Sequence, residues 1–214
     1  MKHIHHIEYP NFLLDYSKLQ NHFKEQFEGL SSAEIGSRFA SFVQRLVPYT
    51  PFGQSFEKPV LNQVSHDQGV DLIASSLTGQ DSLLVQSKYS VRDKAAFGEI
   101  ISKFRDYYQQ RFAADPDSLF AWGGLDLDDG TSKILFQIVT LHDLSRIVDA
   151  FERSELASKN FYHSLTDSGR LEIIDGPKIL RLLQIGYQKS HEQPQNFELQ
   201  FVSELISLNN VYIG

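Results

Sequence analysis

Two segments near the start of the chain carry apolar residues at every third or fourth position, which is the spacing of one buried helix face. The first segment covers residues 12–23 and the second covers residues 35–46. Pro48 and Pro51 follow the second segment, and proline cannot continue a helix because it lacks the backbone N–H. The pattern therefore predicts two leading helices.

After residue 60 the pattern changes from helical spacing to that of strands. Short runs rich in Val, Ile and Leu occupy residues 60–64, 70–74 and 83–89. The last two runs are separated by residues 78–81, whose sequence Thr-Gly-Gln-Asp is typical of a turn. These runs predict a sheet that contains a β-hairpin.

The second half of the chain alternates helical and strand patterns. A long apolar stripe of helical spacing runs over residues 94–112, and Asp93 is placed to cap its amino end. The later predicted elements are a strand over 133–140, a helix over 141–151, a strand over 171–175 and a helix with Pro177 in its first turn. This order predicts an α/β fold with a mixed central sheet flanked by helices.

The chain has 214 residues, of which 41% are hydrophobic and 22% charged, so a disordered or fibrous protein is excluded. We expect a helical lead-in over residues 1–30, a core over 31–190, and a strand segment over 191–214 that leads into a further domain. The absence of cysteine excludes disulfides and thiolate metal sites. No apolar run reaches the roughly 18 residues that span a bilayer, and we expect a cytoplasmic protein without membrane contact.

Polar side chains emerge from the apolar strand predicted over residues 83–89. Alternation places Gln86 and Lys88 on one face of that strand together with Leu84. The predicted hairpin brings Asp71 onto the neighbouring strand, where its carboxylate reaches the same edge. We therefore expect a carboxylate, an amide oxygen and an ammonium group to meet there.

This donor set suits a hard divalent cation and phosphodiester hydrolysis. Mg²⁺ or Mn²⁺ takes oxygen ligands, here from Asp71, from the Gln86 side chain and from the backbone carbonyl of Ser87. Such a cation lowers the pKa of a water and neutralises phosphate charge, while Lys88 orients the water and stabilises developing negative charge. The residue pattern alone is short enough to arise by chance, and it is the strand context that favours a site.

Glu34, on the second predicted helix, has two interpretations. It completes the ligand shell of the cation directly or through water, or it belongs to a capping box that starts at Ser31 and reaches back to a backbone amide. It can also pair with Arg38 one turn later. The sequence leaves these roles open.

The net charge is −7, which excludes the bulk basicity of a non-specific nucleic-acid coat. Residues 88–111 nevertheless carry six basic and three acidic side chains. This local excess predicts that Arg92, Lys94 and Lys103 contact DNA phosphates beside the site. A solvated helix face is the other explanation for the same charges.

Together these residues resemble the PD-(D/E)XK nuclease superfamily, the restriction-endonuclease-like fold, in its Mrr-like branch, where the last acid is commonly Gln. The matching pieces are Glu34, the Gly-Val-Asp run that ends at Asp71, and the Gln-Ser-Lys run from Gln86 to Lys88. Residues 171–177, with the Leu-rich helix after them, are similar to the closing strand and helix of that branch. The resemblance implies metal-dependent DNA cleavage, with Asp71 and Gln86 at the metal, Lys88 catalytic and Glu34 supporting.

A narrower resemblance is to the amino-terminal part of abortive-infection phage-resistance proteins of the AIPR type. It is carried by residues 85–89 and by the Asn-Val-Tyr-Ile-Gly sequence at 210–214. It implies a nuclease domain of a bacterial anti-phage defence protein, and we expect further domains of a longer chain and a homo-oligomer as partners besides DNA. The alternative is a nuclease-fold module without catalysis that binds nucleic acid or a partner protein, because the Gln86 amide is a weaker cation ligand than a carboxylate.

Overall fold

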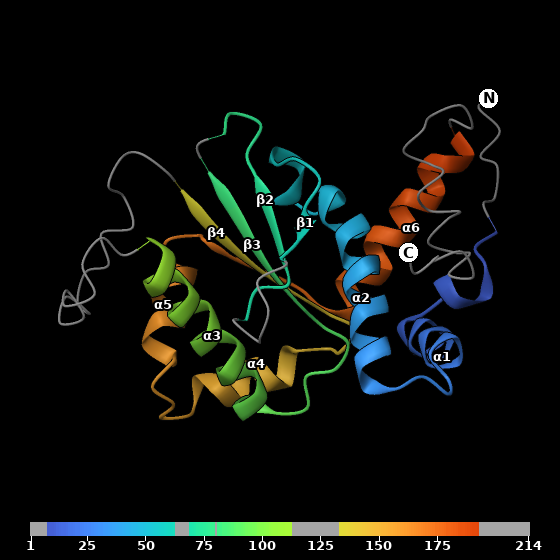
Figure 1. Ribbon diagram of the computed structural model, residues 1–214. Coiled ribbons are helices and arrows are strands. Elements are labelled where there is room, and N and C mark those ends of the chain that lie inside the picture. Colours follow the sequence, from blue (N-terminus) through green and yellow to red (C-terminus); the bar gives the residue numbers. More distant parts are fainter. Residues whose placement is uncertain (1–7, 63–68, 80, 113–132, 193–214) are drawn as a thin grey trace. The chain divides into compact units, whose positions relative to one another are not determined.

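The computed structural model describes residues 8–62, 69–79, 81–112 and 133–192 (Figure 1). The elements in these ranges are, in chain order, η1 (Asn11–Leu13), α1 (Tyr16–Gln26), α2 (Ser32–Leu46), η2 (Val47–Tyr49), η3 (Gly53–Ser55), β1 (Val60–Leu61), β2 (Leu72–Ser75), β3 (Ser82–Lys88), α3 (Lys94–Phe112), β4 (Ile134–Thr140), α4 (Ser145–Glu152), α5 (Lys159–Asp167), β5 (Leu171–Ile174) and α6 (Gly176–Glu192). The chain divides into two compact units, one made of Met1–Arg38 and Gly176–Gly214 and the other of Phe39–Asp175. Each unit is described by itself.

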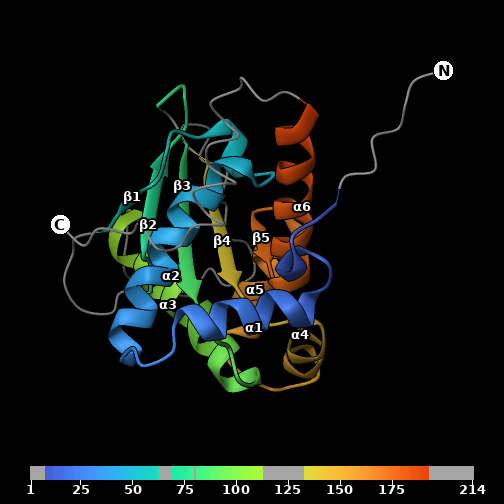
Figure 2. The same cartoon turned by 90° about the vertical axis from the view of Figure 1, so that its right-hand side faces the viewer.

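The central sheet lies in the unit Phe39–Asp175 and has the strand order β1-β2-β3-β4-β5 (Figure 2). Neighbouring strands from β1 to β3 run antiparallel, whereas β3, β4 and β5 are parallel. The register places Leu72 opposite Val85 and places Lys88 opposite Thr140. This mixed sheet with its helices confirms the predicted α/β class.

One face of this sheet packs against α3, α4 and α5 (Figure 1). Alternation along the strands directs Leu84, Phe136 and Ile138 into this layer, where each side chain is fully buried. The ring of Phe136 lies 5.2 Å from that of Phe104 on α3 and 5.9 Å from that of Phe161 on α5, measured between ring centroids. Phe136 therefore joins the sheet to two helices.

The opposite face of the sheet carries a buried polar network. Gln137 of β4 donates its Nε2 to Oε2 of Glu172 on β5 at 2.6 Å and to Oγ1 of Thr50 at 2.7 Å. The backbone amide of Phe52 donates to the same Glu172 oxygen at 3.2 Å. These bonds hold the segment that follows α2 against β4 and the outermost strand β5.

The helix that follows β4 starts later than the sequence pattern predicts. The predicted start at residue 141 is wrong, because the side chain of Asp143 accepts a hydrogen bond from the Ser145 amide at 2.9 Å and closes a turn first. That backbone hydrogen bond is the main cause that lowers the pKa of Asp143 below its ordinary value. The helix α4 therefore begins at Ser145.

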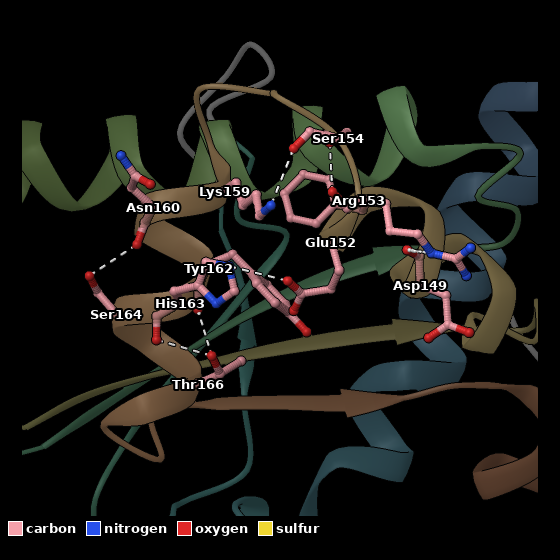
Figure 3. Close-up of polar contacts among 11 residues, drawn as sticks. Asp149, Glu152, Arg153, Ser154, Lys159, Asn160, Tyr162, His163, Ser164 and Thr166 are labelled. Atoms are coloured by element: carbon pink, nitrogen blue, oxygen red, sulfur yellow. Dashed lines mark hydrogen bonds and ion pairs between the residues drawn. The ribbon is translucent and has the colours of Figure 1, made fainter.

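The sequence pattern also misses α5, whose nine residues carry only three buried apolar side chains. A helix this short presents too few repeats of the helical period to be distinguished from a loop. In the structure an ion pair of 3.1 Å links His163 Nε2 of α5 to Glu152 Oε2 at the end of α4 (Figure 3). Burial raises the pKa of the adjacent Tyr162, and the Glu152 carboxylate adds to that rise.

The unit formed by Met1–Arg38 and Gly176–Gly214 is helical in its described residues. Asp15 caps α1 by accepting from the Lys18 amide at 2.8 Å, and Gln184 of α6 donates to the backbone carbonyl of Leu13 at 2.7 Å. None of the described helices is both long and apolar enough to cross a bilayer. The domain borders expected at 30 and 190 stay predictions, and the strand expected over 191–214 lies, from residue 193 on, outside the described residues.

Replacing Phe136 by alanine should lower the free energy of unfolding by about 3–5 kcal/mol, because the change leaves a cavity between the sheet and two helices. Urea unfolding followed by circular dichroism measures this loss. Leu77→Ala is the control, since the Leu77 side chain is 72% exposed and its loss should change stability by no more than about 0.5 kcal/mol. Equal effects of the two variants would contradict the packing described here.

Candidate active site

Asp71 lies directly before β2, at the point where the β2–β3 ladder begins. Its backbone N–H donates to the Val85 carbonyl at 2.9 Å, which fixes the backbone of Asp71 on β3. Gly69, two residues earlier, has a φ of +75°, a conformation that favours glycine. The turn at Gly69 therefore brings the chain into the sheet and sets the position of the Asp71 side chain.

The Asp71 carboxylate and the neighbouring strand are joined by three hydrogen bonds to one oxygen. Oδ2 accepts from Gln86 Nε2 at 2.6 Å, from the Ser87 amide at 2.7 Å and from Ser87 Oγ at 2.7 Å. Gln86 is 1% exposed and Ser87 7% exposed. The structure thus brings Asp71 and Gln86 into direct contact, as strand alternation predicts.

The Ser87 hydroxyl is a site component that the sequence did not reveal. Alternation assigns Ser87 to the face opposite Gln86, and only its backbone carbonyl was expected to take part. In the structure its amide and hydroxyl both hold Asp71, because Asp71 lies at the end of the ladder rather than over one face. The Ser87 carbonyl accepts from Gln86 Nε2 at 3.2 Å.

Lys88 follows at the carboxyl end of β3, on the same face as Gln86. Its side chain is half-buried and makes no ion pair or hydrogen bond with any residue that the structure describes. The ammonium group is therefore available to an anion, and its removal breaks no contact of the described fold.

The hydrogen bonds of the Gln86 side-chain amide bear on whether this site suits a divalent cation. Its NH₂ group lies between two acceptors, Asp71 Oδ2 and the Ser87 carbonyl, while its Oε1 is buried without a hydrogen-bond partner. A buried acceptor without a partner costs about 1–3 kcal/mol. If the amide were turned by half a turn, Oε1 would take the place of the NH₂ group beside the other two oxygens, and this set of three oxygens would suit a hard cation.

The charge of this donor set is low. Within the described ranges there is no cluster of three or more His, Cys, Asp or Glu side chains able to hold a metal. A cation beside Asp71 therefore depends on the neutral oxygens of Gln86 and Ser87 together with a single carboxylate.

Glu34 has the contacts of a capping box. Its Oε2 accepts from the Ser31 amide at 2.8 Å and from Ser31 Oγ at 2.6 Å, and Ser31 Oγ accepts from the Glu34 amide at 3.3 Å. The side-chain hydrogen bond from Ser31 is the main cause that lowers the pKa of Glu34. The helix-cap interpretation accounts for all of these contacts, and a role of Glu34 at the metal stays a prediction.

The basic side chains of residues 88–111 differ in whether they form ion pairs. Arg92 and Lys94, at the amino end of α3, are exposed and have no ion pair among the described residues. Farther along α3, Lys103 pairs with Glu99 at 3.0 Å. A DNA contact by Lys103 therefore has to compete with its ion pair.

Comparison of the chain with protein-family models, curated proteins and solved structures finds no match. The resemblance to the PD-(D/E)XK superfamily therefore rests on the residues and contacts of the chain itself.

Gly69→Ala should lower the free energy of unfolding by at least about 3 kcal/mol, because it combines a positive φ with overlap of packed atoms. A Cβ on Gly69 would lie 2.1 Å from Cβ of Lys103. Gly79 is a matched control, since it also has a φ of +75° but nothing lies within 4 Å of its added Cβ. Gly79→Ala should cost about 1 kcal/mol in urea unfolding, and equal losses would contradict the close approach at Lys103.

Gln86→Glu places a second carboxylate against Asp71, and should lower the free energy of unfolding without cations by about 3 kcal/mol. Mg²⁺ or Mn²⁺ should restore that stability and bind the variant more tightly than the wild type, because hard cations favour charged oxygens. Thermal unfolding with and without the cation, together with calorimetric titration, measures both effects.

Gln137→Glu is the matched control for this experiment, because Gln137 also lies 2.6 Å from a carboxylate, that of Glu172. It should lose stability in the same way but should not recover with Mg²⁺ or Mn²⁺. Equal recovery of both variants, or recovery of neither, would contradict a cation site at Asp71 and Gln86.

Proposed function

We propose that this chain is a metal-dependent nuclease domain of the PD-(D/E)XK type that hydrolyses DNA phosphodiesters with Mg²⁺ or Mn²⁺. One observation carries the proposal, namely the contact of Asp71 with Gln86 and Ser87 at a sheet edge beside the unpaired Lys88. An acid, an amide and a lysine in this arrangement match the residues on which the resemblance rests. The mixed sheet, with the acid directly before β2 and the lysine at the end of its antiparallel neighbour β3, suits a restriction-endonuclease-like fold.

Each residue of the proposed site has its own role in the reaction. Asp71, Gln86 and the Ser87 carbonyl hold the cation, which when bound lowers the pKa of water and neutralises phosphate charge. Ser87 keeps the Asp71 carboxylate in place through its amide and hydroxyl. The Lys88 ammonium stabilises the negative charge that develops on the phosphate.

Positive charge near the site draws the substrate toward it. Arg92 lies between β3 and α3, Lys94 is the first residue of α3, and both side chains are exposed. 

Neither Arg92 nor Lys94 has an ion pair among the described residues. Their attraction for phosphate depends on salt, because DNA binding releases condensed counterions. We place this domain in a longer DNA-cleaving protein of anti-phage defence, as the narrower resemblance implies.

The alternative function is a nuclease-fold module that binds nucleic acid or a partner protein without cutting. Two observations favour it: the described site has a single carboxylate, and Oδ2 of that carboxylate already accepts three hydrogen bonds. In this case Lys88 and Arg92 contact phosphate, and no cation is needed.

Incubation of the protein with supercoiled plasmid and linear DNA in Mg²⁺, Mn²⁺ or EDTA separates the two functions. The nuclease proposal predicts cleavage that needs the divalent cation. DNA binding without cleavage under all three conditions would favour the binding module.

Lys88→Ala should lower the cleavage rate by about 100-fold or more, while the free energy of unfolding should change by no more than about 1 kcal/mol, because the half-buried side chain makes no hydrogen bond or ion pair with a described residue. Lys58→Ala, which removes an exposed lysine outside the proposed site, is the control and should cut normally. Asp71→Asn is preferred to Asp71→Ala, since the alanine would leave the buried Gln86 amide without its acceptor. A folded Lys88→Ala protein that cuts at the wild-type rate would remove Lys88 from the mechanism.

A further inference from the structure

His142 lies at the same end of the sheet as Lys88. The parallel register pairs Lys88 at the end of β3 with Thr140 at the end of β4, and His142 follows two residues later. In open α/β sheets, ligands bind at the carboxyl ends of parallel strands. The imidazole is therefore in the part of the unit where a substrate beside Lys88 would lie.

One ring nitrogen of His142 is held by the backbone. Nδ1 forms a short hydrogen bond with the carbonyl oxygen of Val91, in the segment between β3 and α3. A carbonyl oxygen only accepts hydrogen bonds, so Nδ1 carries the proton and Nε2 carries the lone pair in the neutral ring. This bond fixes both the tautomer and the direction of the ring.

The other ring nitrogen, Nε2, has no hydrogen bond with a residue that the structure describes, and the side chain as a whole is half-buried. The start of α4 does not need the ring either, because the side chain of Asp143 accepts from the Ser145 amide. The contacts at the start of α4 therefore give Nε2 of His142 no role.

We propose that His142 is a proton acceptor for the water that attacks the phosphodiester, an inference that rests on the proposed nuclease function. The water oxygen forms the new P–O bond as one of its protons passes to Nε2. The P–O bond to the leaving oxygen breaks, and that oxygen takes a proton from solvent. The imidazolium then returns its proton to solvent, so the ring is unchanged after each turnover.

Charged side chains on the two segments that meet at His142 can influence how the reaction depends on pH. Lys88, Arg92 and Asp93 lie on the segment from β3 to α3, and Asp143 and Arg146 lie on the segment from β4 into α4. Because only a neutral imidazole can accept a proton, the proposed role requires cleavage to be slower in acid than in neutral solution.

A matched pair of variants separates the two ring nitrogens. His142→Asn keeps a donor near Nδ1 for the Val91 carbonyl but has nothing at Nε2, whereas His142→Gln extends toward Nε2 without the same donor. We expect His142→Asn to unfold at the wild-type urea concentration and to bind a DNA duplex in EDTA with wild-type affinity. Its single-turnover cleavage should be about 10²-fold to 10⁴-fold slower at pH 8, without the acidic limb of the wild-type profile.

The other outcomes overturn the proposal in distinguishable ways. Normal cleavage by His142→Asn together with lower stability of His142→Gln would make the ring a structural link to Val91. If His142→Asn lost affinity for DNA at low pH but cleaved bound DNA at the wild-type rate, the His142 ring would be a phosphate-binding group and not a proton acceptor. Absence of cleavage by the wild type would remove the nuclease function itself, and the proposal with it.

Nitrogen-15 NMR of the wild-type ring provides a test that does not depend on any variant folding. The proposal predicts a protonated Nδ1 and an unprotonated Nε2 at neutral pH, and a ring titration that coincides with the acidic limb of the rate. The opposite tautomer, or a titration separated from that limb by more than about one pH unit, would overturn it.

Discussion

The arrangement at this sheet edge depends on the hydrogen bonds that one oxygen of Asp71 accepts from Gln86 and Ser87. They join the residue before β2 to the end of β3, where Lys88 follows Ser87 in the sequence. The Gln86 NH₂ group lies between the Asp71 carboxylate and the Ser87 carbonyl and donates to both. In the proposed nuclease these two oxygens would hold the cation.

The chain uses an amide to hold a carboxylate twice, on opposite faces of one sheet. Gln137 contacts Glu172 at 2.6 Å, the same distance as Gln86 to Asp71. The Gln137–Glu172 pair joins β4 to the outermost strand β5 and is bound to Thr50 and Phe52, so it fixes a loop. The Asp71–Gln86 pair lies where β2 begins and β3 ends, close in sequence to Lys88, and that position, not the pair itself, argues for chemistry.

The period of two residues was enough to predict that Lys88 lies on the same face as Gln86, and the predicted hairpin was needed to bring Asp71 to Gln86. The sequence could not show that Ser87 reaches Asp71, since that depends on where the ladder begins. The close approach of Gly69 to Lys103 joins residues far apart in the chain, and a single sequence carries no signal for it. For Glu34 the capping-box pattern was visible, and the contacts agree with it.

The most direct test of the cation site is paramagnetic NMR with Mn²⁺. Low concentrations of Mn²⁺ should selectively broaden the side-chain amide signals of Gln86 and the backbone amide signal of Ser87. Excess Mg²⁺ should reverse this broadening, and Asp71→Asn should abolish it. The side-chain amide of Gln137, on the opposite face, should be affected far less. Broadening that is absent, or that is equally strong at Gln137, would contradict a cation site at Asp71.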